Sequence, residues 1–356
     1  MKKRLTVIYG AAPELSTSFQ TRELTRFLAD SFEVEHRALR RGLKGKAYQV
    51  SRLWRNYLTP ALQRPRVDLA LYGNDGFVDL RHWRGRRALY WYDAPADWSV
   101  TPPRNFQERL RYHNVVEADD VFAVSAAQVR VAKVLRSGRE KSVYYLPVGV
   151  DCEAFDPAKA DRSGLRRRFG FSEADIVIGY LGYLGIWNDR FAGETLLEAA
   201  RLLSNASLRF LVIGSGPALP KWKEIVRKFD LEKRFVFAGF VEQVGLASAI
   251  ATMDICVDTL EPGFHSEARS ETKLKQYMAM GRACVGTDIG ENRIDLDHGR
   301  AGLLSGPGAE ELAKTISGLA ENADERQRLG KAARARAVEI YDWRRLAEQM
   351  AEVLQC

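Results

Sequence analysis

The sequence predicts two α/β domains, each built on a doubly wound parallel sheet. The chain has 356 residues, whereas a single hydrophobic core stops growing at about 250–300 residues, so two domains are expected. Short β-branched runs alternate with helical patterns along the whole chain, which is typical of parallel sheets covered by helices. Proline and glycine gather at residues 147–157, between two series of such repeats. We therefore expect one domain at residues 1–155 and a second from residue 156.

The first domain is expected to contain strands that alternate with helices. Apolar, β-branched runs predict strands at 5–9, 67–72, 88–92, 121–124 and 143–146. Helical periodicity predicts helices at 19–29, 105–118 and 126–135. This alternation supplies the crossover connections that parallel strands require.

The second domain repeats the pattern. Its predicted strands are 176–181, 208–213, 235–238, 255–257 and 283–287, and its predicted helices are 193–203, 220–229 and 271–280. A long amphipathic tail follows at 310–354. Because ligands of such sheets bind beyond the carboxyl ends of the strands, we expect the two sheets to face a cleft.

Composition excludes several classes of protein. Hydrophobic residues make up 46% and charged residues 28% of the chain, as in an ordinary globular protein. No apolar run approaches the ~20 residues needed to span a bilayer. Four cysteines lie scattered without paired spacing, which argues against a disulfide framework and favours a reducing compartment. The basic N-terminus is similar to a secretion signal, but its apolar stretch is too short, so a cytoplasmic location is expected.

Positive charge is concentrated in one segment of the first half. Net charge is +8, and residues 1–160 carry 27 Lys and Arg against 18 Asp and Glu. The excess peaks in the basic segment Arg37–Arg66, which has no acidic residue and has aromatic and aliphatic side chains at near-helical spacing. This pattern is typical of a helix on an anionic membrane surface. A solvated helix and a nucleic-acid contact are the alternatives, although no nucleic-acid motif accompanies the segment.

Two glycine turns follow predicted strands of the second half. Gly182 and Gly185 follow the strand 176–181 and allow the backbone to approach a ligand, and Arg190 adds a cation suited to phosphate oxygens. Gly214 and Gly216 follow the strand 208–213 but do not match a complete dinucleotide or P-loop motif. Ordinary strand–helix turns are the alternative in both places.

The helix predicted at 271–280 is the most informative segment. Ser270 is expected to cap it and Gly281 to end it. Lys273 lies in the first turn, where the helix dipole disfavours a cation unless an anion sits nearby. Gln276 lies one turn further on the same face, within reach of a ribose hydroxyl. A surface lysine is the alternative interpretation.

Metal chemistry is not expected. Five histidines show no ligand spacing. Asp295-Leu296-Asp297 follows a glycine loop, and we interpret it as a surface turn. His265, in the loop before the 271–280 helix, is a candidate contact to a sugar.

Taken together, these segments resemble the family 4 retaining glycosyltransferases, which adopt the two-domain GT-B fold. The resemblance covers nearly the whole chain. It rests on short segments that match in order: Tyr92-Asp93, Ala118–Ser125, Pro147–Asp151 with Phe155, Leu196–Ala199, Ser270–Gly281 and Asp342-Trp343. It implies an acceptor domain at 1–155, a nucleotide-sugar donor domain at 156–335, and a closing helix at 336–356 that returns to the first domain.

The resemblance also implies roles for individual residues. Lys273 and Arg190 would hold the nucleotide diphosphate, and Asp93 would orient or deprotonate the acceptor hydroxyl. Two acids of the family's E-x7-E pair are replaced here by Ala268 and Gln276. Glu271 is then a candidate replacement for the lost ribose contact.

The sequence therefore predicts a metal-independent glycosyltransferase that uses a UDP- or GDP-sugar donor and no further cofactor. The acceptor would be a glycan or lipid-linked sugar in cell-surface polysaccharide or glycolipid synthesis, with retention of configuration. The basic segment would hold the enzyme on the inner membrane face. A catalytically silent subunit that binds a nucleotide-sugar or a partner transferase is the alternative. A nucleotide-sugar epimerase is disfavoured because paired acid–base groups are lacking.

Overall fold

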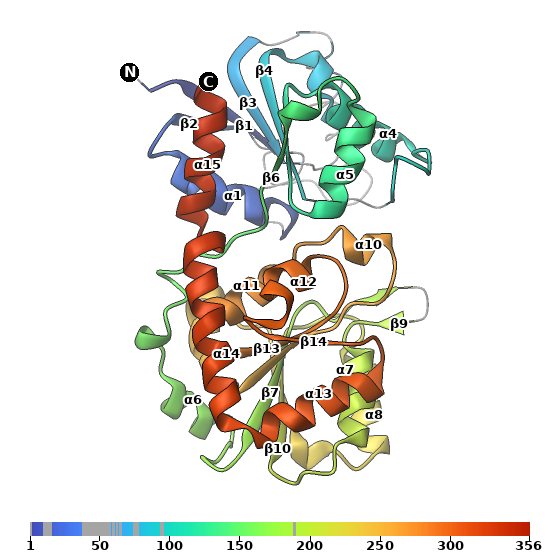
Figure 1. The fold of residues 1–356 in the computed structure, drawn as a ribbon, viewed down its shortest axis with the longest axis vertical. Helices are drawn as coiled ribbons and strands as arrows, with labels where there is room; N and C mark the ends of the chain where they lie inside the picture. Colours follow the sequence, from blue (N-terminus) through green and yellow to red (C-terminus); the bar gives the residue numbers. More distant parts are fainter. Residues whose placement is uncertain are drawn as a thin grey trace. The chain divides into compact units, whose positions relative to one another are not determined.

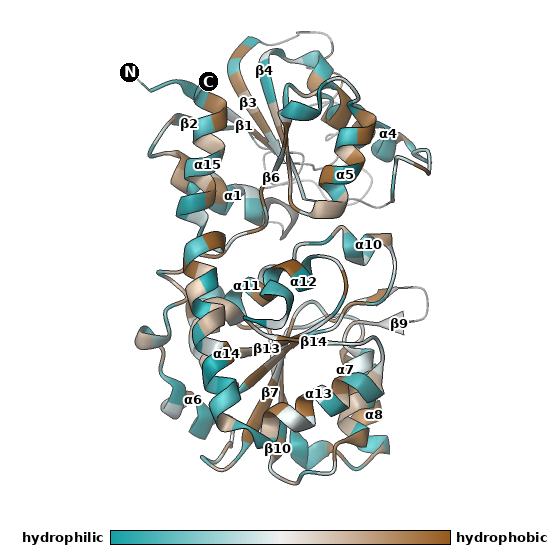
Figure 2. Cartoon of the chain, viewed as in Figure 1, coloured by the Kyte–Doolittle hydropathy of each residue, from teal (hydrophilic) through white to brown (hydrophobic). Residues whose placement is uncertain are grey.

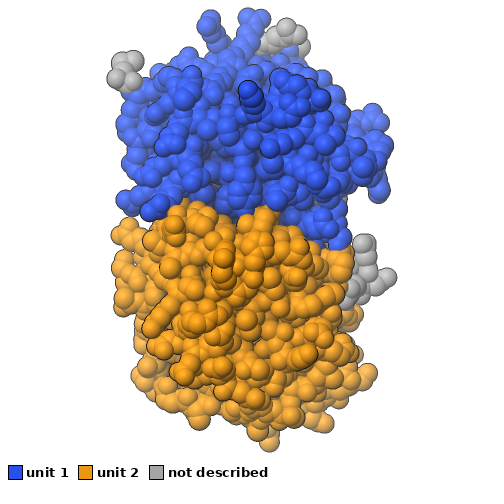
Figure 3. Space-filling model, in the orientation of Figure 1, with its two compact units in different colours: residues 1–149, 263–270, 343–356 blue, residues 150–262, 271–342 orange. Residues whose placement is uncertain are grey.

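The computed structural model describes residues 2–9, 16–37, 66–73, 78–92, 96–187 and 190–356, and the single residues 58, 61 and 63. They form two compact units, which Figure 3 colours separately. Unit 1 comprises residues 1–149, 263–270 and 343–356, and unit 2 comprises residues 150–262 and 271–342. We expected the division after residue 155 and a closing helix over 336–356. In the structure unit 2 begins at Val150, and residues 336–342 remain part of it.

Unit 1 is built on a six-stranded parallel sheet with the order β2-β1-β3-β4-β5-β6. The strands are β1 (Arg4–Tyr9), β2 (Glu33–Arg37), β3 (Arg66–Gly73), β4 (Arg84–Trp91), β5 (Asp120–Ala123) and β6 (Val143–Tyr145). The central strands carry near-continuous apolar runs because helices cover both faces of the sheet. The strand order reverses between β1 and β3, which is the hallmark of a doubly wound sheet.

Helices cover the two faces of this sheet. They are α1 (Ser16–Leu28), α4 (Phe106–Glu117), α5 (Ala126–Leu135) and α15 (Trp343–Gln355). The short α10 (Phe264–Glu267) also belongs to unit 1. α15 lies beside α1 (Figure 1), and Leu24 of α1 and Met350 of α15 share one buried cluster with Leu5 of β1. Val115 of α4 and Val131 of α5 belong to the cluster on the opposite face.

Unit 2 contains a second six-stranded parallel sheet, with the order β11-β10-β7-β12-β13-β14. Its strands are β7 (Ile176–Leu181), β10 (Leu208–Ile213), β11 (Phe235–Gly239), β12 (Ile255–Asp258), β13 (Ala283–Thr287) and β14 (Leu303–Ser305). A two-stranded antiparallel ribbon, β8 (Ile186–Trp187) and β9 (Arg190–Phe191), follows β7. The predicted pair of doubly wound sheets is confirmed.

The second sheet is also covered on both faces, and Figure 2 shows its strands as an apolar layer. The helices are α6 (Arg162–Arg168), α7 (Glu194–Leu202), α8 (Leu219–Lys228), α9 (Gln243–Ala251), α11 (Thr272–Ala279), α12 (Glu291–Asp295), α13 (Ala309–Glu321) and α14 (Ala323–Arg336). Buried residues of α7, α8 and α13 share one cluster, and those of α9, α11 and α14 share the other.

Several elements escaped prediction. β2 was missed because its sequence, Glu-Val-Glu-His-Arg, has one apolar residue, as suits a strand at the edge of the sheet. α6, α9, α12, β14 and the β8–β9 ribbon were also missed. The amphipathic tail is not one helix, because Asn322 caps the start of α14 and a π-helical turn, Ala337–Tyr341, separates α14 from α15.

Most of the basic segment Arg37–Arg66 lies outside the described residues. Arg37 ends β2 and Arg66 begins β3, and both side chains are exposed. Within the part of the chain that the structure describes, no helix has the length and apolar character needed to cross a bilayer.

Candidate functional site

The candidate site lies in unit 2, at the carboxyl ends of β7 and β12. The strand order of the sheet reverses between these two neighbours. At such a reversal, the connections that follow the two neighbouring strands run to opposite sides of the sheet and leave a crevice between them. Open α/β sheets bind their ligands in this crevice. Gly182 directly follows β7, and Asp258 is the last residue of β12.

Two glycine loops line this edge and lie in direct backbone contact. The Gly182 amide donates to the Ile213 carbonyl at 3.0 Å, and the Gly214 amide donates to the Gly239 carbonyl at 2.7 Å. A Cβ on Gly214 would lie 1.9 Å from the Gly182 carbonyl oxygen. A Cβ on Gly216 would lie 2.3 Å from the Leu184 carbonyl oxygen. Gly214 and Gly216 are therefore required for the two loops to pack against each other, which gives these glycines a structural role.

Lys273 brings a cation to the same edge. It lies in the first turn of α11, and its Nζ is 2.9 Å from Oδ1 of the fully buried Asp258. The ammonium also lies 5.0 Å from the ring centroid of Tyr180, and 3.9 Å from where a Cβ of Gly182 would be. Burial would lower the pKa of Lys273, but the negative charges of Asp258 and Glu271 outweigh it and the pKa is raised. Lys273 therefore stays charged at any physiological pH.

The helix that carries Lys273 is fixed to the end of β7. The Tyr277 hydroxyl accepts a 2.7 Å hydrogen bond from the Leu181 amide, the last of the strand. Burial raises the pKa of that hydroxyl, so it stays protonated. Gln276 is buried on the same helix, and Glu271 occupies the N-cap position. Ser270, predicted as the cap, instead accepts a hydrogen bond from the Val148 amide within unit 1.

The other predicted site residues are placed less completely. Gly185 is buried, and its carbonyl accepts from the Ala192 amide at the base of the β8–β9 ribbon. Arg190 begins β9, and its side chain lies outside the described part of the structure. Asp93 lies outside the described residues. His265 is exposed on α10, which belongs to unit 1, so its contact with a sugar stays a prediction.

Sequence reasoning missed Asp258 and Tyr180. Each is a single polar residue in an apolar strand, and neither belongs to a motif. The available signal was positional. Asp258 directly follows the predicted strand 255–257, and polar residues at the carboxyl ends of parallel strands gather at one edge of the sheet.

The interpretation of Asp295-Leu296-Asp297 as a surface turn was wrong for its first residue. Asp295 is fully buried at the end of α12, where it forms an ion pair with the equally buried Lys275. Asp297 pairs with Arg300 and Arg336. Across the described ranges, no group of three or more His, Cys, Asp or Glu side chains is placed to hold a metal ion.

Comparison with known proteins places this site in a family. Residues 175–322, which include β7, β12 and Lys273, match the family described as Glycosyl transferases group 1. This segment is similar to group 1 glycosyltransferase domains. The whole chain shares the GT-B fold of solved glycosyltransferases, as predicted. It superposes on the Anabaena protein HepE in complex with UDP and glucose with a TM-score of 0.77 over 99% of both chains, at 17% identity.

Two curated relatives extend beyond the domain. The chain is 26% identical to a 2-deoxystreptamine glucosyltransferase of Streptomyces kanamyceticus over 232 residues, which are 61% of this chain and 57% of that protein. It is 24% identical to a GDP-mannose-dependent α-(1-6)-phosphatidylinositol monomannoside mannosyltransferase of Mycobacterium tuberculosis over 266 residues, 72% of this chain and 66% of that protein. The matches thus span between about half and two thirds of these relatives' lengths.

Proposed function

We propose that the protein transfers a sugar from a nucleoside diphosphate sugar, linked to UDP or GDP, to a glycan or lipid-linked acceptor. The observation that carries the proposal is the largely buried ammonium of Lys273 at the switch point of the second sheet. A cation that is mostly shielded from water, permanently charged and held beside a glycine loop suits a diphosphate. The relatives support this choice, because their names specify glucosyl and mannosyl transfer and one solved neighbour holds UDP.

Lys273 would act on the leaving group. Cleavage of the bond between the sugar and the diphosphate builds negative charge on the departing phosphate oxygens. A cation already in place stabilises that charge without reorganisation, and removing one such group costs about 10²–10³ in rate. Asp258 would hold the Lys273 ammonium in position, and Arg190 would supply a second cation. Retention of configuration is part of the proposal and rests on the family resemblance.

The donor site can be tested by ligand-induced stabilisation. Thermal unfolding of the purified chain would be followed with UDP, GDP and their glucose and mannose conjugates. A diphosphate present at 100 times its Kd adds about 2.7 kcal/mol to the free energy of unfolding. We expect one nucleotide to raise the melting temperature, Lys273→Ala to lose the effect, and Lys314→Ala, an exposed lysine of α13, to keep it. Absence of any shift in the wild-type chain would refute the proposal.

A catalytically silent subunit remains a second candidate, and one observation favours it. Gln276 stands where the family resemblance expects the glutamate that grips the ribose. Slow hydrolysis of the donor sugar separates the candidates, because both bind the nucleotide but only a transferase turns it over. Turnover that Lys273→Ala abolishes would establish the enzyme, whereas nucleotide binding without turnover would favour the subunit. The anomeric configuration of the product, followed by NMR, tests retention.

We also propose that the basic segment Arg37–Arg66 holds the protein on the cytoplasmic face of a membrane, near a lipid-linked acceptor. Its charge and aromatic residues support this, since each basic residue near an anionic surface contributes about 1 kcal/mol. Changing Arg40, Arg41, Arg52 and Arg55 together to Glu should abolish sedimentation with anionic vesicles. Unchanged sedimentation would exclude this role.

A further inference from the structure

A cavity in unit 2 lies at the opposite edge of the sheet from Lys273. It has a volume of about 530 Å³ and is lined from the amino ends of β12 and β13 and from α14. Asp254 precedes β12 and Arg282 precedes β13, whereas Asp258 of the candidate donor site is the last residue of β12. Four residues of extended strand separate the two edges by roughly 13 Å. The cavity is therefore distinct from the donor site.

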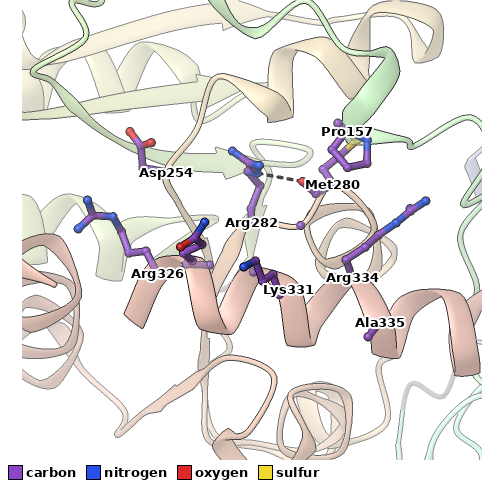
Figure 4. A pocket seen from close by; sticks show the side chains of 12 residues that line it. Pro157, Asp254, Met280, Arg282, Arg326, Lys331, Arg334 and Ala335 are labelled. Atoms are coloured by element: carbon purple, nitrogen blue, oxygen red, sulfur yellow. Dashed lines mark hydrogen bonds between the residues drawn. The ribbon is translucent and has the colours of Figure 1, made fainter. Parts of the chain in front are cut away.

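Four cations line this cavity: Arg282, Arg326, Lys331 and Arg334. Figure 4 shows the last three projecting from α14 toward the side where Arg282 lies. The hydrogen bonds of the three arginines go to backbone carbonyl oxygens. Within the described part of the chain, the exposed Lys331 ammonium engages no carboxylate. Carbonyl groups satisfy the donors but supply no full negative charge.

The one carboxylate that lines the cavity is already engaged. Asp254 forms ion pairs with Arg162 and Arg166, and it accepts a 2.8 Å hydrogen bond from the Val177 amide. Both of its ion pairs are therefore with cations outside the cavity lining. Burial lowers the pKa of the Arg282 guanidinium, and the charge of Asp254, which acts in the opposite direction, does not offset that effect.

Close backbone packing forms the floor of the cavity. A Cβ on Gly330 of α14 would lie 2.3 Å from the Gly281 carbonyl oxygen, so glycine is required where the helix crosses the turn before β13. Gly281 has a φ of 62°, a conformation that favours glycine. This contact brings Lys331, the residue after Gly330, next to the Arg282 side of the cavity. The cations are thus held by rigid elements around a preformed space.

We propose that this cavity binds a phosphate-bearing anion, either a soluble phosphorylated metabolite or a phospholipid headgroup. Four cations and one carboxylate, which already forms ion pairs elsewhere, line the cavity, so an anion with several oxygens would balance the excess positive charge through charge-assisted hydrogen bonds. The volume lies in the range of small-molecule sites and exceeds the needs of a single inorganic phosphate. The site is independent of the proposed donor site, and its test does not depend on transferase activity.

The test uses pyrophosphate as the soluble probe and the Lys273→Ala chain as the background, so that the donor site contributes little. Binding would be measured by isothermal titration calorimetry in this background alone, with Lys331→Glu added, and with Lys314→Glu added. Lys331 and Lys314 are both exposed helical lysines, so the two reversals change the net charge equally. We expect one site, weakened about tenfold by reversal of the partly screened charge at Lys331 and unchanged by reversal at Lys314.

A second arm distinguishes the two sources of phosphate. Sedimentation with vesicles of phosphatidylglycerol and phosphatidylcholine would be compared among the same three chains, all of which keep the basic segment Arg37–Arg66. If Lys331→Glu reduces sedimentation with the vesicles and Lys314→Glu does not, the cavity is assigned to a lipid headgroup. If Lys331→Glu weakens pyrophosphate binding only, and leaves sedimentation unchanged, the cavity is assigned to a soluble ligand. If the two reversals behave alike in both arms, the proposal is overturned.

Discussion

Changing Asp258 to Asn tests the geometry of the candidate site most directly. The substitution removes the carboxylate that pairs with Lys273 at 2.9 Å and keeps the shape of the side chain. Leaving one member of a buried ion pair without its partner costs about 3–5 kcal/mol. The Lys273 side chain retains 13% exposure, so we expect the lower value, about 3 kcal/mol. For a unit of about 150–250 residues, each kcal/mol lowers the melting temperature by about 2–4 °C, so the drop should be about 6–12 °C.

The control is the double variant Asp258→Asn with Lys273→Met, which removes both charges. In the double variant the ammonium that Asp258→Asn would leave unpaired is gone. Lys273→Met should therefore cost less unfolding free energy in the Asp258→Asn chain than in the wild-type chain, with a coupling energy of about 1–3 kcal/mol. Thermal unfolding followed by circular dichroism is measured for the wild-type chain, the two single variants and the double variant. A drop of less than about 1 °C for Asp258→Asn, or additive effects in the double variant, would refute the reasoning.

The pH dependence of this pair follows from the raised pKa of Lys273. A lysine whose pKa is higher in the folded state contributes stability that is fully present below its ordinary value of 10.5 and is lost progressively as the pH rises from there through the raised value. The difference in melting temperature between the wild-type chain and Asp258→Asn should therefore stay constant between about pH 6 and pH 9. A difference that shrinks within that range would show that the ammonium is not held as described.

Three other perturbations give separate checks. Gly214→Ala places a Cβ 1.9 Å from the Gly182 carbonyl oxygen, so the loops must separate; we expect a loss of about 1–3 kcal/mol in unfolding free energy and at least tenfold weaker nucleotide binding, measured by calorimetry. Unaltered binding would contradict the close approach. Asp295→Asn should cost about 3–5 kcal/mol, whereas Asp295→Leu combined with Lys275→Met should cost far less, because no buried charge is left alone. Equal costs in denaturant titrations would argue against the pair. Cys356 is exposed while the other three cysteines are buried with raised thiol pKa values, so one thiol per native chain should react with a disulfide reagent at pH 8; more than one would contradict their burial.

Most of the fold could be predicted because its strands are buried on both faces. β7, β10 and β13 have the predicted limits, since their continuous apolar runs end at glycine or polar residues. β2 could not be found in this way, because an edge strand buries little and tolerates Glu33 and Arg37. α9 was missed because its face is formed by small residues around Gly245, which give almost no amphipathic contrast.

The candidate site was predictable in part. Lys273 stood out because a cation in the first turn of a helix opposes the helix dipole. Its partner Asp258 could not be identified, because the pairing depends on the order of strands in the sheet, which the sequence does not specify. The same limitation explains Asp295, where only the packing of α12 against α11 shows that a triplet similar to a metal motif forms a buried ion pair.

The discontinuity of the two units has a consequence for how the chain is made. The chain passes between the units four times, and the last passage delivers α15 to unit 1. Trp343, Leu346 and Met350 of this helix are buried in the same cluster as β1. At about 5–20 residues per second, these residues leave the ribosome some 10–40 s after Gly149, the end of the first segment of unit 1. Until α15 is synthesised, the part of the first sheet's apolar face that this helix covers thus stays exposed, and α1 is the helix of the same cluster already made.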